Sequence, residues 1–518
     1  MRSALLAPSL FAAALLVGCG AYRPARFADR DPITVVPDAP IPRPARTVIP
    51  EWSRYAEAYV KRWLVDGLDP RRTPEAGDID AFDRVVESAW FAPARPPSLE
   101  GYTRAAPAPP FAPVTDDRVL EKLALEVVDD ADGRRWELSP EAPERARLRS
   151  SAGAISSRLL FALGYHAAES HVLVREDGTR VLAIAWSTPR AEARAGERCD
   201  WLGSTRPTGT REDDDNDVVP HEDRRSLRVL GLVSSWVGLR EIRPRVLRDV
   251  YVGEDGAGHV EHQVAGLEDS LGAGALLAAL RRDDERPARN PWVALGSLGF
   301  SAKESADPDA APFPTVGLFP EHADPRRDRL AVPFGPAQDA LPSDLYWMGK
   351  RIAVVSDDTL ASAVQAGQLD TDASAYLVRA LAERREDVAR FAVSLVTPLE
   401  IRADAALMLD PAGSRFLSIG LRDEAITRGY ASSESTRYLV ELMGEDGTLA
   451  APGFELTPRG SSADLALPFD LFDGRDYLVV RLRSVRDGMP APRWMEVHLR
   501  RHDGPERETD VRIRGVRH

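Results

Sequence analysis

Cysteine is nearly absent from the chain, whose 518 residues include only Cys19 and Cys199. No catalytic spacing surrounds Cys199, so we expect a partly buried thiol rather than a nucleophile. Basic charge is also in deficit, because 67 Lys and Arg residues face 81 Asp and Glu residues and give a net charge of −14. This balance argues against nucleic acid as a partner, and against attachment to anionic lipid through charge alone.

Long apolar stretches are missing beyond the N-terminus. The apolar run at residues 5–17 is roughly 13 residues long, short of the ~18 that a membrane-spanning helix needs, but it suits the core of a signal peptide. It follows Arg2 and leads into residues 16–19, Leu-Val-Gly-Cys, which resemble the lipobox of bacterial lipoproteins. The resemblance implies that residues 1–18 are a signal peptide and that Cys19 carries acyl chains, which leaves Cys199 no disulfide partner. An ordinary secretory signal with a chance cysteine, or a short buried helix, is the alternative.

The residue after the lipobox cysteine is Gly20 rather than Asp. By resemblance to the enterobacterial sorting rule, this implies an outer-membrane lipoprotein that faces the periplasm. Several acyl chains on one residue suffice for stable anchoring, so the membrane is a predicted partner. Residues 19–50 are predicted to be a lipidated tether, because the Pro-rich stretch at 37–44 favours an extended, semi-rigid spacer.

Beyond residue 50, periodicity predicts an α+β chain. Residues 123–128 and 135–138 are typical of strands joined by a tight turn at 129–133, and further strands are expected at 171–174 and 181–186. Helices are expected at 154–163 with a stop at Gly164, after a cap at Ser226, and at 271–280, 358–366 and 372–395. After about residue 396 the pattern alternates, at 437–443, 477–483, 494–500 and 511–516. We therefore predict a C-terminal antiparallel, β-sandwich-like domain at residues 396–518.

Two segments offer metal-ligand residue types, but neither has the spacing of a known site. The acidic stretch at 211–217 fails as an EF-hand, because Val218 stands where glycine is needed and Arg224 where a bidentate glutamate belongs. We expect a solvated acidic loop there. On a strand, His259 and Glu261 would share one face while His262 points to the other, so we expect no zinc site. No metal is predicted.

Glycine-rich segments give weak signals as well. Gly272 and Gly274 resemble half of a dinucleotide-binding loop, but the third glycine and the following acidic residue are missing. Ser297 lacks the first glycine of a nucleophile elbow and is expected in a turn. These patterns alone identify no competent catalytic constellation.

Several segments together resemble a family of uncharacterised exported proteins of environmental bacteria, notably myxobacteria. They include residues 76–83, 88–91, 157–165, 215–228, 262–274, 347–352 and 382–386, and they cover most of residues 50–395 in order. That family is similar to atypical protein kinases. The resemblance implies a kinase-like domain at residues 51–395, with a β-rich N-lobe and a helical C-lobe.

The resemblance also implies a strand lysine, a helix glutamate, a catalytic loop and a metal-binding turn, and the sequence departs at each of them. Ser139 stands near the lysine position and Gly153 near the helix acid. The catalytic-loop segment is 236–241, with Val246 near its downstream asparagine, and the metal-binding turn is 266–269. Without these groups a triphosphate lacks counterions, because phosphoryl transfer depends on positioning and charge neutralisation.

We therefore predict a lipid-anchored, catalytically inert, pseudokinase-like binding or scaffolding protein, with no cofactor and with an envelope protein or glycan as partner. The first alternative is an active atypical kinase or nucleotidyl transferase, with Glu241 as base and with Glu268 and Asp269 as ligands for Mg²⁺ and ATP. The second is a carbohydrate- or peptidoglycan-binding lipoprotein that uses exposed aromatic residues such as Tyr477 and Trp494, although a core position is favoured for both because large aromatics dominate cores.

Overall fold

The structure is a computed structural model. It describes residue 27 and residues 37–57, 75–102, 106–115, 117–141, 145, 147–186, 199–284, 311–328, 330–402, 404–503 and 509–518. The predicted signal peptide, Cys19 and Ser297 lie outside these ranges. Within them, no helix has both the length and the apolarity to span a membrane. The chain divides into two units: residues 33–80 with 84–393, and residues 1–32 with 81–83 and 394–518.

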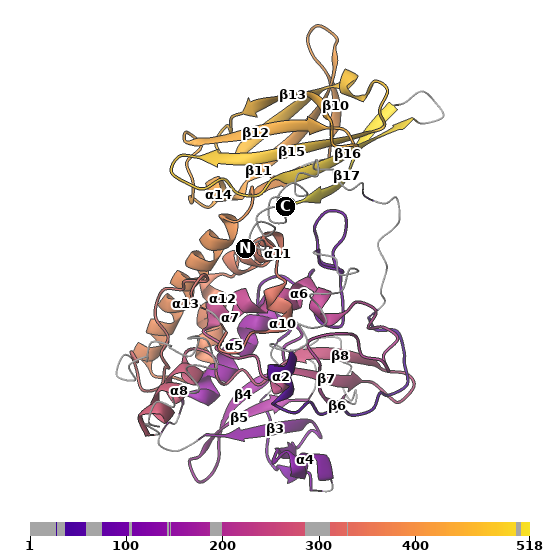
Figure 1. Cartoon of the computed structure of the whole chain (residues 1–518). Helices are drawn as coiled ribbons and strands as arrows, with labels where there is room; N and C mark the ends of the chain where they lie inside the picture. The colour runs from indigo at the N-terminus through magenta and orange to yellow at the C-terminus, as the bar shows by residue number, and fades with distance from the viewer. Residues whose placement is uncertain are drawn as a thin grey trace, which may run out of the picture. The chain divides into compact units, whose positions relative to one another are not determined.

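A five-stranded antiparallel sheet forms one part of the first unit (Figure 1). Its order is β1-β2-β3-β5-β4, with β1 at Ala112–Pro113, β2 at Glu126–Asp129, β3 at Arg135–Pro140, β4 at Ser170–Val174 and β5 at Arg180–Ala185. The predicted hairpin is confirmed, because Glu126 of β2 lies opposite Leu138 of β3. Helix α5 (Arg149–Leu163) packs against β4 and β5 and ends at Gly164, whose φ of 108° suits glycine.

The short helix α4 (Arg118–Lys122) precedes β2 and is capped by Asp117. The Asp117 carboxylate accepts a hydrogen bond from the amide of Val119 at 3.0 Å and forms an ion pair with Arg46. Burial alone would raise the pKa of Asp117, but the contacts with Arg46 and the helix amides outweigh it and lower the pKa below its ordinary value. The carboxylate is therefore most useful to the helix when it is ionised.

A second sheet in this unit holds three antiparallel strands, β6 (Cys199–Ser204), β7 (Leu247–Val252) and β8 (His259–Val264). Residues 37–50 pack against it rather than forming a free spacer. Ile41 is buried and bridges Gly258, while the Thr47 amide donates to Leu202 at 2.8 Å. This part of the predicted tether therefore belongs to the fold, because its backbone groups find partners on the sheet.

This unit has further helices, and most of them share one apolar core with α5. Their bounds are α2 (Ser53–Ala56), η4 (His221–Asp223), α6 (Arg225–Arg228), α7 (Leu230–Val237), η5 (Pro244–Val246), α8 (Ala273–Asp284), α10 (Gly335–Gln338), α11 (Pro342–Ala353), α12 (Asp357–Gln365) and α13 (Thr371–Val393). Helix α13 packs on α7, α11 and α12. Ser226 was expected to be a cap and lies instead within α6, so that prediction is wrong. The chain enters α6 directly from η4, so the helix begins before the serine.

A buried ion pair joins α6 to the start of α11. The Arg225 guanidinium lies 2.8 Å from Asp344, and the two residues are 1% and 0% exposed. Asp344 also accepts a hydrogen bond from the amide of Leu341 at 2.9 Å, at the N-terminus of α11. Removing one member of such a pair would leave an uncompensated charge in the core.

Gly272, which resembled part of a dinucleotide loop, serves the packing of the chain instead. Its φ is +75°, and an added Cβ would lie 2.3 Å from the backbone carbon of Leu318. Two backbones approach here at a distance that only glycine allows. The glycine is therefore required by the fold, with no need for a cofactor to explain it.

The second unit contains two antiparallel sheets that share one core. One has the order β10-β11-β14 with β9 also on β11, and comprises β9 (Leu399–Ile401), β10 (Ala406–Leu409), β11 (Arg415–Asp423) and β14 (Ser462–Pro468). The other has the order β13-β12-β15-β16-β17, with β12 (Thr436–Met443), β13 (Leu449–Leu456), β15 (Tyr477–Arg486), β16 (Met495–Asp503) and β17 (Thr509–Arg517). The short helices α14 (Glu424–Thr427) and η7 (Phe469–Phe472) complete it. The described chain is thus a mixed α and β structure with several antiparallel sheets.

A polar network is buried inside this second unit. Asp423 accepts a hydrogen bond from the hydroxyl of Tyr438 at 2.7 Å and pairs with Arg486 at 2.6 Å. The same carboxylate caps α14 through the amide of Ala425 at 2.8 Å. One buried carboxylate therefore ties together β11, β12, β15 and α14.

Candidate functional site

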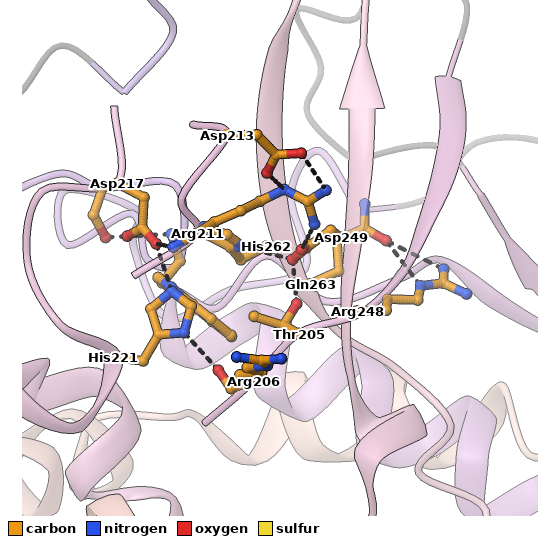
Figure 2. Close-up of polar contacts among 12 residues, drawn as sticks. Thr205, Arg206, Arg211, Asp213, Asp217, His221, Arg248, Asp249, His262 and Gln263 are labelled. Atoms are coloured by element: carbon orange, nitrogen blue, oxygen red, sulfur yellow. Dashed lines mark hydrogen bonds and ion pairs between the residues drawn. The ribbon is translucent and has the colours of Figure 1, made fainter. Parts of the chain in front are cut away.

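A buried histidine–carboxylate centre lies beside the three-stranded sheet (Figure 2). It comprises Asp217 from the acidic loop, His221 at the start of η4 and His262 on β8. Their ligand-capable atoms all lie within 4.8 Å of one another, and the residues are 4%, 1% and 0% exposed. The prediction of a solvated loop is therefore wrong for Asp217, because the loop folds inward and places this carboxylate against the sheet.

Asp217 has polar contacts on both oxygens. Its Oδ1 accepts a hydrogen bond from Arg224 at 2.8 Å, and its Oδ2 lies 2.8 Å from Nε2 of His221 and accepts from the amide of Arg211 at 2.7 Å. Burial alone would raise the pKa of Asp217, but the hydrogen bond and charge of His221, with the charge of His262, outweigh it and hold the pKa well below its ordinary value. Asp217 is thus an ionised, buried acceptor.

The other ring nitrogen of His221 fixes how that imidazole is oriented. Nδ1 lies 2.5 Å from the carbonyl oxygen of Arg206, and a dashed line marks this contact in Figure 2. A carbonyl oxygen only accepts hydrogen bonds, so Nδ1 carries the proton. Nε2 of a neutral His221 would then present a lone pair to the Asp217 carboxylate, and a proton or another cation must lie between the two acceptors.

His262 is held by its partner across the sheet. Asp249 of β7 faces it in the antiparallel register, and His262 Nδ1 lies 2.6 Å from Asp249 Oδ1. Arg211 pairs with the second Asp249 oxygen at 2.6 Å, and the Thr205 hydroxyl donates to the first. Burial alone would lower the pKa of His262, but the charge of Asp249 raises it above its ordinary value. The remaining nitrogen, Nε2, is buried and has no hydrogen-bond partner.

Trp90 covers the two histidines on one side. Its ring stacks on His262 with centroids 4.6 Å apart and an interplanar angle of 17°, and it meets His221 edge-on at 5.0 Å. On another side His221 and Asp249 line a pocket of about 460 Å³, together with Arg211, Thr205 and neighbours. The centre therefore has an apolar cover and a polar opening.

The three carboxylates predicted as catalytic candidates also converge. We call their group the arginine–carboxylate cluster, and it consists of Glu241, Glu268 and Asp269 with Arg54, Arg149, Arg243 and Arg245. Glu241 lies 3.0 Å from Arg54 and 3.2 Å from Arg243. Glu268, whose side chain is 2% exposed, lies 3.1 Å from Arg149 and 2.7 Å from Arg245.

Asp269 completes the cluster through longer contacts with the same arginines. It lies 3.3 Å from Arg149, 3.6 Å from Arg245 and 3.7 Å from Arg243. Burial alone would lower the pKa of Arg245, but Glu268 and Asp269 outweigh it and raise the pKa, so this arginine stays charged. The pocket lined by Arg54 and Arg243 measures about 30 Å³, the space of a few water molecules.

The positions expected for the kinase lysine and for the helix glutamate both lie next to Leu182 of β5. Ser139 of β3 is the register partner of Leu182, and a Cβ on Gly153 of α5 would lie 2.4 Å from the same leucine. Leu182 is 1% exposed, so a glutamate at position 153 would require this buried side chain to move. Ser139 carries no charge and Gly153 has no side chain, so these positions cannot form the lysine–glutamate pair.

The aromatic residues considered for glycan binding form no exposed row. Tyr477 is 2% exposed, and its hydroxyl lies 3.1 Å from Nδ1 of His498. Trp494 is half-buried, and the guanidinium carbon of Arg481 lies 4.7 Å above its ring centroid. Tyr477 is therefore a core residue rather than an exposed glycan contact. The ring of Trp494 is covered on one face by the Arg481 guanidinium.

Comparisons with known proteins give little beyond this geometry. No protein-family model matches the chain, and no curated protein matches it. Among solved structures, the crystal structure of a Helicobacter pylori proinflammatory kinase, CtkA, is similar at 8% identity, over 58% of this chain and 93% of that chain. The TM-score is 0.29. A likeness of this size carries no argument about activity.

Proposed function

We propose that this chain is a lipid-anchored, non-catalytic binding protein of the bacterial envelope, with a pseudokinase-like domain before its C-terminal β unit. The observation that carries the proposal is the arginine–carboxylate cluster. Each carboxylate that a kinase reading would assign to catalysis already has arginine counterions within 3.3 Å.

This pairing disfavours phosphoryl transfer for two reasons. A Mg²⁺ ion would have to displace guanidinium groups that already neutralise Glu268 and Asp269. The triphosphate would also lack the lysine that ordinarily balances its charge, since Ser139 stands near that position. The cluster links Arg149 of α5 to Glu268 and Asp269, which follow β8. It is better suited to this structural role than to catalysing transfer from a nucleotide.

Nucleotide binding is the direct test. Purified full chain should show no thermal shift with ATP and Mg²⁺ or Mn²⁺, and no phosphate transfer to itself or to a generic protein substrate. Metal-dependent ATP binding together with transfer would overturn the proposal.

A variant can show whether the arginines are the cause. Arg149→Met combined with Arg245→Met should expose Glu268 and Asp269 to Mg²⁺ and produce measurable metal binding that the wild type lacks. Arg243→Met, which leaves both arginine partners of Glu268 in place, is the matched control and should stay inert. If the double variant binds no more Mg²⁺ than the control, the ion pairs are not what excludes the metal.

Anchoring has a separate test. Cys19→Ala should abolish incorporation of radiolabelled fatty acid and release the chain from the membrane fraction. Persistent labelling of the variant would contradict the proposed anchor.

A further inference from the structure

We propose that Asp217, His221 and His262 bind a divalent transition-metal ion of the zinc class. This inference does not rest on the proposed function. Two imidazoles and a carboxylate are a donor set that zinc prefers. The spacing of their atoms, 2.8 Å between His221 and Asp217 and at most 4.8 Å across the set, brackets the roughly 3.3 Å between ligands in a tetrahedral zinc site.

The groups around the histidines occupy Nδ1 of each ring and leave Nε2 as the nitrogen available for a ligand. Nδ1 of His221 donates to the Arg206 carbonyl, and Nδ1 of His262 is held by the Asp249 carboxylate. Metal-bound histidines ordinarily donate their second nitrogen to a carbonyl or carboxylate in this way, which fixes the tautomer and leaves Nε2 free to coordinate. Both histidines therefore carry the supporting hydrogen bond that a ligand needs.

The orphaned nitrogen of His262 is the independent indication of a ligand. Nε2 is fully buried and has no hydrogen-bond partner, although a buried polar atom without one costs free energy. Ligand-capable atoms of Asp217 and His221 lie within 4.8 Å of a His262 ring nitrogen, and Asp217 Oδ2 and His221 Nε2 are 2.8 Å apart with a proton or another cation between them. A metal ion placed among them would satisfy all three atoms at once.

Charge and access are compatible with a dication. Four carboxylates surround the centre, Asp213, Asp214, Asp217 and Asp249, against two guanidiniums, Arg211 and Arg224. The 460 Å³ pocket reaches His221 and gives an entering ion a route. Water or an anionic ligand in the pocket would complete the coordination, since three protein ligands leave a zinc ion one open position.

Co²⁺ is the probe for the test, because a tetrahedral Co²⁺ ion has intense visible absorption. Full chain stripped with a chelator should bind one equivalent of Co²⁺ with such bands, and Zn²⁺ should displace it. His262→Gln and His221→Gln should each weaken binding by roughly 100-fold or more, and Asp249→Asn by roughly tenfold, the effect of a lost supporting group. His259→Gln, on the same strand, is the matched control and should bind within about twofold of wild type.

A thermal shift keeps the test informative if a variant folds poorly. Zn²⁺ should raise the unfolding temperature of the wild type and of His259→Gln, but not that of a folded His262→Gln protein. Substoichiometric binding by the wild type would overturn the proposal. So would unchanged binding in His262→Gln, or equal losses in His259→Gln, which would indicate adventitious surface histidines.

Discussion

The buried pair of Arg225 and Asp344 allows a quantitative prediction. Asp344→Ala removes the counterion 2.8 Å from a guanidinium that is 1% exposed. An uncompensated buried charge costs about 3–5 kcal/mol, and the lost hydrogen bond to the Leu341 amide adds about 1 kcal/mol. We discount this total because Asp78 also lies near Arg225, and expect a loss of about 4 kcal/mol in the free energy of unfolding.

Urea unfolding followed by tryptophan fluorescence measures this loss. Nine of the ten tryptophans precede residue 394, so the signal reports mainly on the unit that contains the pair. With a denaturant slope of about 3 kcal/mol per M, the midpoint should fall by roughly 1.3 M. Glu321→Ala breaks an ion pair with Arg379 whose side chains are 38% and 58% exposed, and should cost about 1 kcal/mol or less.

A double variant separates charge from packing. Arg225→Met with Asp344→Leu removes both charges and should recover most of the lost stability, because a well-packed apolar pair often matches a buried ion pair. If Asp344→Ala unfolds within about 1 kcal/mol of wild type, or if the double variant is no better than the single one, the uncompensated charge is not the cause.

Three further predictions concern other parts of the chain. Tyr438→Phe should cost about 1–3 kcal/mol because it removes a donor to the buried Asp423 carboxylate, and faster hydrogen exchange in β12 would show it. Gly272→Ala should cost about 2 kcal/mol or more, since its Cβ meets the Leu318 backbone at positive φ; an unchanged melting temperature would contradict this. Asp117→Ala should weaken α4 by about 1 kcal/mol at pH 7. Because the pKa of Asp117 is lowered in the fold, that contribution is present above its ordinary pKa and fades as the pH falls through the folded value, so exchange of α4 amides in wild type and variant should converge in acid.

Local patterns predicted the regular elements well where one face is buried. Helices α12 and α13 lie within two residues of their expected bounds, because apolar spacing and a helical period agree. Strands β12, β15, β16 and β17 were anticipated from alternation. Strand β13 was missed because most of its side chains are exposed and carry no alternating signal, whereas β14 alternates Ala463, Leu465 and Leu467 and could have been found.

The two sites differ in how much of them the sequence could reveal. Glu241, Glu268 and Asp269 were selected from the kinase resemblance and do converge, but their arginine partners come from three separate segments and gave no pattern. The histidine–carboxylate centre was not predicted, because Asp217 and His262 were considered in two separate segments and set aside, and His221 was not considered. His221 and Asp217 are four residues apart, but His262 joins them only through the β7–β8 register and the inward fold of the acidic loop. Such long-range juxtaposition leaves no periodic trace.

Trp90 has a consequence beyond packing. Its indole lies flat against His262 and edge-on to His221, fully shielded from solvent. Light absorbed by this ring is emitted next to two imidazoles, whose protonation alters how strongly they quench an excited indole. The molecule thus contains an intrinsic optical reporter at the histidines, and comparing the emission of wild type with that of Trp90→Phe would isolate its signal without any attached dye.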